Sequence, residues 1–200
     1  MNGEEDKRLK LLEKARDHFL THGYRGASLR NIARDAGLTT GALYHHFRGK
    51  DELFVDVCLH GFELMNRRFE SAEKMTEGRP PAERIMAFFD AYVSFFFENR
   101  DYYELIERLQ INREKLRIPE ELMERIKQAS SASLAPMVRA ISAGGGDWSE
   151  KRTFEQVILF VAFAEGLFQC LRKGLLDRTG VPFGDVRSLI LSKLPGLLEG

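Results

Sequence analysis

Cysteine and tryptophan are scarce in this 200-residue sequence, which has two cysteines and one tryptophan. Cys58 and Cys170 lie far apart and form no CxxC pair, so free thiols in a reducing compartment are the simplest interpretation. The first ten residues, MNGEEDKRLK, are too polar for a secretory signal, and no run approaches the roughly 18 apolar residues that span a bilayer. We therefore expect a soluble, cytoplasmic protein that does not contact a membrane.

Motifs that carry catalysis are also missing. The sequence contains no nucleophile–base motif, P-loop or dinucleotide fingerprint, so we predict neither an enzyme nor a cofactor. His18 and His22 have a spacing that can bind a metal, but no third ligand is evident, and solvated histidines are the preferred interpretation. Cys58 could be a redox sensor, although nothing nearby lowers its pKa or supplies a resolving thiol.

The charge is balanced overall but uneven along the chain. The 30 basic and 30 acidic residues cancel, yet residues 1–50 hold ten lysines and arginines against six acidic residues, a net charge of +4. The rest of the chain therefore carries a net charge of −4. All five histidines also lie within the first 60 positions. A basic N-terminal segment on an acidic remainder predicts that one end of the protein contacts a polyanion.

Apolar residues recur with the 3.6-residue period of helices almost throughout, and no segment reads as a strand. The 44% hydrophobic content and 15 phenylalanines are enough for a sizeable core. We predict an all-α fold of about nine helices. Pro136 and Pro195 fall inside helical patterns and should kink or shorten them. The predicted helices cover about 9–22, 29–36, 40–47, 51–75, 82–98, 101–113, 119–143, 150–173 and 184–198.

The stretch SLRNIARDAGLTTGALYHHF, residues 28–47, predicts a helix-turn-helix. Gly37 can supply the positive φ of the turn, Ala33 is small where the two helices approach, and Leu43 and Phe47 point inward. The outward positions of the second helix lack carboxylates, so they can approach phosphates and base edges. They are Thr39, Thr40, Gly41, Tyr44 and His45. The alternative is an ordinary helical hairpin in an α-bundle.

The longer run from Gly23 to Phe54 closely resembles the DNA-binding domain of the tetracycline-repressor (TetR/AcrR) family. The resemblance implies a homodimeric transcriptional regulator, with repression the preferred mode, that binds a palindromic operator and is released by a small hydrophobic effector. It divides the chain into a helix-turn-helix domain at 1–49 and an effector-binding and dimerisation domain at 50–200. Lys14, Arg16 and His18 depart from the family pattern because they make the first helix unusually polar.

The resemblance also implies roles for individual residues. Ser28 would cap the second helix and, with Arg30, touch phosphate. Tyr44 would contact phosphate, His45 would lie at the groove edge, and Lys50 would grip the DNA backbone. The implied DNA-binding residues are Ser28, Arg30, Thr39, Thr40, Gly41, Tyr44, His45 and Lys50.

Aromatic residues form a stripe on the predicted fifth helix, and the eighth is apolar nearly all round. Ordinary core packing explains most of these residues, but in the resembled family the middle helices enclose an effector pocket. Glu165, a lone carboxylate among apolar residues, is either a polar anchor of that pocket or a partner within the dimer interface. The predicted ligand-binding residues are Phe89, Tyr92, Phe96, Tyr103, Phe163 and Glu165. An aromatic compound, a drug-like cation or a fatty acyl chain would suit them, and Glu165 favours a cation.

The resemblance further implies a homodimer that pairs through its last two helices. An apolar stripe on the final helix supports this, because it is too apolar to face water. It consists of Val186, Leu189, Ile190, Leu194 and Leu197. Two other functions remain open, namely an all-α adaptor that uses the N-terminal hairpin for protein contacts and an all-α enzyme without an evident catalytic motif.

Overall fold

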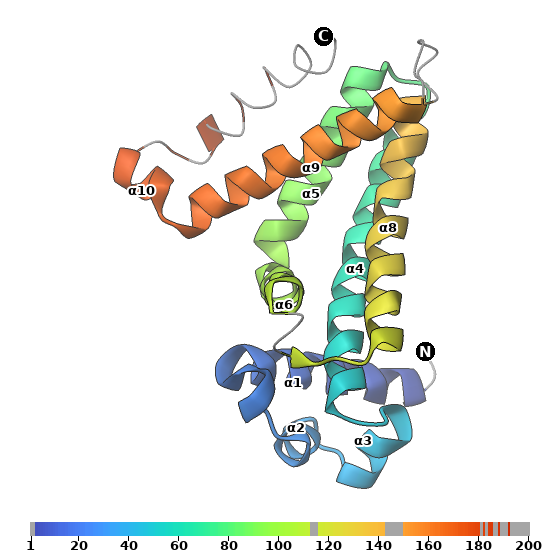
Figure 1. Cartoon of the computed structure of the whole chain (residues 1–200), viewed down its shortest axis with the longest axis vertical. Helices are drawn as coiled ribbons and strands as arrows, with labels where there is room; N and C mark the ends of the chain where they lie inside the picture. The colour runs from blue at the N-terminus through green and yellow to red at the C-terminus, as the bar shows by residue number, and fades with distance from the viewer. Residues whose placement is uncertain are drawn as a thin grey trace. The chain divides into compact units, whose positions relative to one another are not determined.

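The computed structural model describes residues 3–112, 116–142, 150–180, 182, 184, 185, 188 and 192. The described residues are helical with no strand, which confirms the predicted all-α fold. Figure 1 shows the order of the helices along the chain. Their bounds are α1 (Gly3–Gly26), α2 (Leu29–Asp35), α3 (Thr40–His46), α4 (Lys50–Met75), α5 (Pro81–Glu98), α6 (Arg100–Ile111), α8 (Glu120–Ser142), α9 (Glu150–Arg172) and α10 (Leu175–Thr179).

The helices form two compact units. Unit 1 comprises residues 1–64 and 99–132, and unit 2 comprises 65–98 and 133–200. The long helices α4 and α8 each contribute their first part to unit 1 and their second part to unit 2. Packing therefore divides the chain within α4 and α8. The division at residue 49, inferred from the family resemblance, separates functions rather than packed units and stays a prediction.

In unit 1, helix α1 packs against both α2 and α6, and α2 packs against α3. The side chains between α1, α2 and α3 are almost completely buried. Leu11, Leu12 and Phe19 of α1 meet this core, which also contains Ile32 of α2 and Leu43 of α3. Burial of such side chains stabilises each by about 1.5–3 kcal/mol relative to exposure, which fixes the relative position of the three short elements.

Two glycines set the directions of the chain in this unit. Gly23 has φ of +68° and interrupts α1 three residues before its end. Gly37 has φ of +70°, which confirms its predicted role in the turn between α2 and α3. The turn is closed by two backbone hydrogen bonds, from the Gly37 N–H to the Arg34 carbonyl and from the Leu38 N–H to the Ala33 carbonyl, both 2.9 Å long. A side chain at either glycine would be strained because L-residues rarely adopt this φ.

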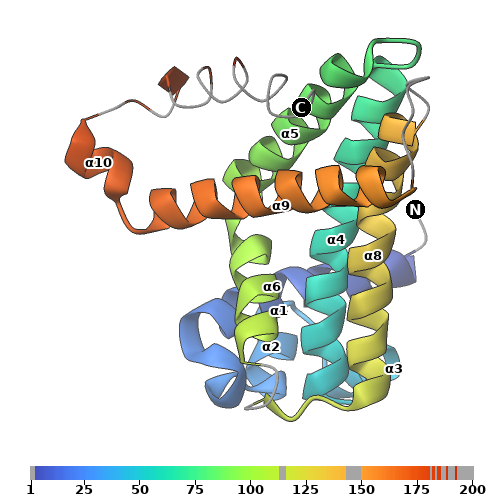
Figure 2. The same cartoon turned by 45° about the horizontal axis from the view of Figure 1, so that its top comes forward.

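Helices α4 and α8 run side by side in Figures 1 and 2, and an ion-pair cluster joins their first parts to α1. The buried carboxylate of Asp56 accepts hydrogen bonds from Arg8 of α1 at 2.6 Å and from Arg125 of α8 at 2.7 Å. The Arg8 guanidinium also lies 5.6 Å from the centre of the Phe47 ring. One carboxylate therefore connects three helices of unit 1, and we call Asp56, Arg8 and Arg125 the Asp56 cluster.

In unit 2, helix α9 lies across α5 in both views. Aromatic rings from the two helices fill the contact. Phe96 of α5 stacks on Phe168 of α9 with ring centres 4.0 Å apart, and Phe89 meets Phe160 edge to face at 5.8 Å. Such pairs contribute about 0.5–1.5 kcal/mol beyond the burial of their area.

Several helix ends differ from the predictions. Helix α1 begins at Gly3 rather than near residue 9, because the carboxylates of its first turn suit the positive end of the helix dipole. Helix α8 continues through Pro136 to Ser142. Residues 175–179, predicted to be a break, form the short α10 between two glycines with positive φ. Of the predicted helix at 184–198, only residues 184, 185, 188 and 192 are described, and they are helical. Pro195 and the five residues of the apolar stripe lie outside the described residues.

Candidate nucleic-acid interface

The outward side of α3 is a polar, aromatic face of unit 1, formed by the five predicted residues Thr39, Thr40, Gly41, Tyr44 and His45. We call it the α3 face. Leu43 is fully buried beneath it, so α3 packs on the core with one side and exposes the other side to solvent. Tyr44 is 55% exposed although it is large and aromatic, and the His45 side chain is 76% exposed. A β-carbon added at Gly41 would meet nothing closer than the Thr39 hydroxyl at 3.7 Å. No side chain at position 41 therefore keeps another molecule away from the start of α3.

The two helices of the motif begin differently. Thr39 occupies the N-cap of α3, and its Oγ1 accepts a hydrogen bond from the Ala42 N–H at 3.1 Å. This bond leaves the hydroxyl proton of Thr39 available to an external acceptor. Ser28 occupies the N-cap position of α2, but its side chain accepts no capping hydrogen bond, so the predicted cap is wrong in this detail. The first N–H groups of α2 and the Ser28 hydroxyl can then serve a bound anion instead.

A surface hollow of about 520 Å³ lies between α2 and the start of α3. The predicted residues Arg30, Thr39 and Thr40 line it, together with Asn31 and Arg34. Asn31 and Arg34 were missing from the sequence prediction. Helical spacing could have identified them in the sequence, because positions 30, 31 and 34 share the outward side of α2. Arg34 is 71% exposed, although its Nε donates to the neighbouring Asp35 at 3.0 Å. The structure thus places a cation and an amide of α2 next to the α3 face.

Lys50 has a structural role that the sequence did not reveal. Its ammonium donates to the backbone carbonyls of Arg25 at 3.1 Å and Ala27 at 2.9 Å, and it lies 5.4 Å from the centre of the Tyr24 ring. It therefore holds the segment between α1 and α2 against the start of α4. An ammonium has three donors, so a third remains for a DNA phosphate.

The polar residues of α1 have partners in neighbouring helices. His18 lies 2.8 Å from the Asp35 carboxylate at the end of α2, and its ring is 5.5 Å from that of His22. Together with the neighbouring Arg34, His18 holds the pKa of Asp35 below its usual value. Within the described part of the chain, no group of three or more His, Cys, Asp or Glu residues is placed to hold a metal ion.

The buried position of Cys58 argues against the redox-sensor alternative. The side chain is fully buried in α4, and burial raises the pKa of its thiol well above the usual value. Because the thiolate is the reactive form, Cys58 is a core residue rather than a reactive one.

Five of the six predicted ligand-binding residues lie together where α5 meets α9. Phe89 and Phe96 are buried, and Phe163 lies 6.1 Å from Phe89, ring centre to ring centre. The Tyr92 hydroxyl donates to the Glu165 carboxylate at 2.7 Å, which supplies the polar partner that this carboxylate requires. The sixth residue, Tyr103, is buried in α6 and belongs to unit 1. The five residues of unit 2 remain candidates for an effector site.

Helix α9 has a second apolar side. Its large exposed side chains are spread over about half of the helix circumference, with exposures of 60% for Phe154, 51% for Ile158, 54% for Leu159 and 38% for Phe163. We call these four residues the α9 face. By length and composition, Thr153–Arg172 could also cross a membrane, contrary to the expectation that no run approaches this length. Helices that pack on two sides in a soluble assembly have the same composition, so this property alone does not indicate a membrane span.

Helices α2 and α3 and the Gly37 turn between them form a helix-turn-helix. The family model of the bacterial regulatory proteins of the tetR family matches residues 11–57, which include α2, the Gly37 turn and α3. This part of the chain is similar to the DNA-binding domain of the tetR family, in agreement with the resemblance seen in the sequence.

Individual relatives agree with this assignment. The HTH-type transcriptional repressor KstR2 of Mycobacterium tuberculosis is 38% identical over 86 residues, which are 42% of this chain and 42% of the relative. The chain thus spans well under half the length of such curated relatives. A protein of unknown function from Rhodococcus sp. RHA1 superposes with a TM-score of 0.73 and 25% identity, covering 94% of this chain and 93% of its own. A tetR-family regulatory protein from Rhodococcus RHA1 has a TM-score of 0.64 at 20% identity, covering 79% and 80%, which shows the shared fold.

Proposed function

We propose that the protein is a ligand-responsive transcriptional repressor that binds a palindromic DNA operator as a homodimer. The observation that carries the proposal is the α3 face, where an exposed tyrosine and hydroxyl groups lie on a short helix held rigidly from behind. Such a helix fits the major groove, which is about 12 Å wide and admits one α-helix. The similarity of 86 residues of the chain to the repressor KstR2 supports the same conclusion.

Each residue of the α3 face and each neighbouring polar residue has a proposed role. The Ser28 hydroxyl, the Arg30 guanidinium and the Tyr44 hydroxyl bind phosphates. Thr39, Thr40 and His45 face the bases, and Gly41 lets the helix approach the groove closely. Lys50 contributes its third donor while it holds the α1–α2 segment in place. Arg34 joins Arg30 along the same side of α2.

The α9 face supports the homodimer. Four large apolar side chains on the exposed half of one helix are costly to hydrate, at about 25 cal/mol per Å² of apolar area. A second subunit that packs on α9 about a two-fold axis would cover them. In this proposal the predicted final helix completes the interface. Two α3 faces related by that axis bind half-sites about 34 Å apart, which is one turn of DNA.

The five candidate residues between α5 and α9 provide the proposed effector site. A hydrophobic effector that separates these rings would have to displace the stacking of Phe96 on Phe168. Glu165 favours a cationic or hydrogen-bond-donating group, since Tyr92 already shows that this carboxylate accepts a donor. Binding would shift the dimer towards a spacing of the α3 faces that no longer fits the operator.

The test is operator binding by variants of exposed residues. An inverted repeat upstream of the protein's own gene serves as the DNA, and Tyr44→Ala should weaken binding by roughly tenfold or more because a hydrogen bond to a charged group is lost from each half-site. Met75→Ala is the matched control, since Met75 is 78% exposed at the end of α4 and belongs to unit 2. Equal binding by both variants would instead favour an adaptor or an enzyme.

A further inference from the structure

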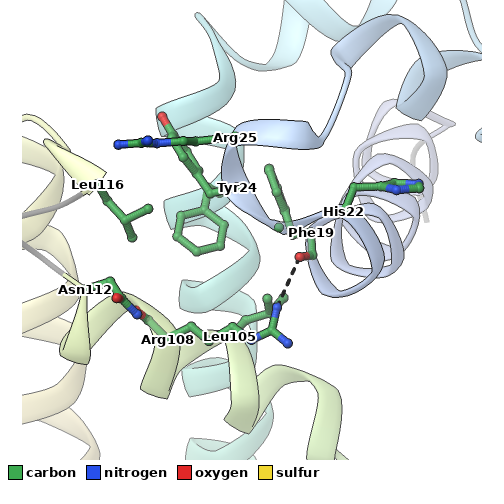
Figure 3. A pocket seen from close by; sticks show the side chains of 10 residues that line it. Phe19, His22, Tyr24, Arg25, Leu105, Arg108, Asn112 and Leu116 are labelled. Atoms are coloured by element: carbon green, nitrogen blue, oxygen red, sulfur yellow. Dashed lines mark hydrogen bonds between the residues drawn. The ribbon is translucent and has the colours of Figure 1, made fainter.

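Unit 1 contains a second hollow, unrelated to the α3 face. It has a volume of about 410 Å³ and lies between the end of α1, the start of α4 and α6 (Figure 3). Its apolar lining includes Phe19, Phe54, Leu105 and Leu116. The volume falls within the roughly 300–1,000 Å³ of small-molecule sites, which are mostly apolar with a few convergent polar groups.

The shape of the hollow follows from the break at Gly23. Because α1 ends its regular course there, Tyr24 turns away from the helix and lies beside Phe54, with ring centres 5.3 Å apart. The Tyr24 hydroxyl donates to Asp51, and Lys50 lies over its ring. The wall of the hollow is therefore held by a hydrogen bond and a cation–π contact, so it is preformed rather than dependent on a ligand.

Two arginines supply the polar groups at its edge. Arg108 of α6 reaches the last carbonyls of α1 before the Gly23 break, with Nη1 at 3.5 Å from the Phe19 oxygen and 3.4 Å from the Leu20 oxygen. Figure 3 shows this contact at one side of the hollow and Arg25 at another. Nη2 of the same guanidinium donates to the carboxylate of Glu104, one turn earlier in α6. Both carbonyl contacts of Nη1 are long, whereas a guanidinium binds a carboxylate at about 2.7–2.9 Å. The described residues that line the hollow include no aspartate or glutamate.

We propose that this hollow binds a small monocarboxylate with an apolar body, such as a medium-chain alkyl acid or an aryl acid. The carboxylate takes Nη1 of Arg108 in place of the two long carbonyl contacts, while Nη2 keeps its bond to Glu104. The apolar body lies on Phe19, Phe54 and Leu116. Arg25 adds a positive charge at the opposite edge. This site lies in unit 1 and prefers an anion, whereas the proposed effector residues lie in unit 2 around the carboxylate of Glu165.

A bound acid would also loosen a contact between α6 and α1. Arg108 is one link between these helices, and α1 in turn packs on α2 of the helix-turn-helix. We expect the acid to change DNA affinity through this link, and this consequence rests on the proposed function. The binding itself does not, because it is measured without DNA.

The test is calorimetric titration of the full-length protein with octanoate and phenylacetate, and with octanamide and octylammonium as neutral and cationic counterparts. We expect the acids to bind and the amide and amine to bind at least about tenfold more weakly. Arg108→Met should weaken acid binding by a similar factor, and Leu116→Trp should block it by filling the hollow. Met75→Ala, at an exposed position in unit 2, is the control and should leave acid binding unchanged.

Three results would overturn the proposal, namely no binding of either acid, equal binding of the amide, or full binding by Leu116→Trp. Arg108→Lys distinguishes the effect of the positive charge from an effect on folding, because it keeps a cation at the same position. It should bind acid better than Arg108→Met. Should Arg108→Met fail to fold, methyl resonances of Leu105 and Leu116 in the wild type give a second readout. Octanoate should shift them and octanamide should not, and unmoved resonances would count against the site. Operator binding by the wild type would be unaffected by any of these failures.

Discussion

Replacing Asp56 with asparagine tests how the helix-turn-helix is joined to the rest of unit 1. The Asp56 side chain is 8% exposed, and its two partners, Arg8 and Arg125, are 38% and 41% exposed. Breaking a buried ion pair by removing one partner costs about 3–5 kcal/mol because a charge is left without compensation. Here the two guanidiniums can regain water and the amide oxygen still accepts one hydrogen bond. We therefore expect a loss of about 2 kcal/mol in the free energy of unfolding.

For a chain of this size, 1 kcal/mol corresponds to roughly 2–4 °C in Tm, so Asp56→Asn should lower Tm by about 4–8 °C. Differential scanning calorimetry at fixed protein concentration measures the change, because Tm of an oligomer depends on concentration. Lys10→Gln is the control, since it removes an ion pair to Asp6 that is exposed at both ends. An equal Tm for Asp56→Asn and Lys10→Gln would refute the idea that the Asp56 cluster joins α1 to α4 and α8.

Three further outcomes are expected in other parts of the molecule. Gly61→Ala should lower the free energy of unfolding by about 1–2 kcal/mol in urea titrations, because the new β-carbon would lie 3.0 Å from the Cβ of Tyr102. A higher free energy of unfolding would mean that α4 and α6 are packed less tightly. The hydrogen bond from Arg139 lowers the pKa of Glu73 from its usual 4.5, so the charged pair stabilises the protein above that pH and the effect is lost as pH falls through the lower folded-state value. Tm of Glu73→Gln should accordingly lie below that of the wild type at pH 7 and converge with it below about pH 4.5, whereas a constant difference would contradict the linkage. Ile158→Lys should shift sedimentation from dimer to monomer, and an unchanged dimer would exclude the α9 face from the interface.

The local features of the helix-turn-helix could be predicted from sequence because each depends on near neighbours. Gly37 was assigned the turn because few residues adopt its φ, and Leu43 was placed inward by helical spacing. Lys50 was different, since its partners are backbone carbonyls more than 20 positions away, and residue type carries no information about them. The sequence could name it as a cation but could not show that it also holds the α1–α2 segment.

The polar positions of α1 illustrate the same limit. Arg16 and His18 looked like departures from the family pattern. The structure places Arg16 3.7 Å from Asp101 of α6, with its guanidinium 5.2 Å from the Tyr102 ring centre, and gives His18 a partner at the end of α2. These contacts follow from the packing of α1 on two helices, and a helical period shows only which residues share a face.

The aromatic stripe was predicted correctly as one face of α5, whereas Tyr103 lies apart from it. Helical spacing grouped Phe89, Tyr92 and Phe96, and the structure confirms that they meet α9 together. Tyr103 lies only seven positions after Phe96, yet the chain leaves its helical course at Asn99, where φ is −127° and ψ is 37°. A change of direction at a residue that is neither glycine nor proline leaves little signal in the sequence.

The most direct test of the central claim is the salt dependence of operator binding, compared between the wild type and Arg30→Gln. Each phosphate contact contributes about −0.9 to the slope of log Kobs against log salt concentration, so a dimer with one Arg30 contact in each half-site should lose about 1.8 from that slope. The wild type should also prefer the inverted repeat over the same sequence with one half-site scrambled. An unchanged slope together with equal affinity for the scrambled DNA would contradict the account.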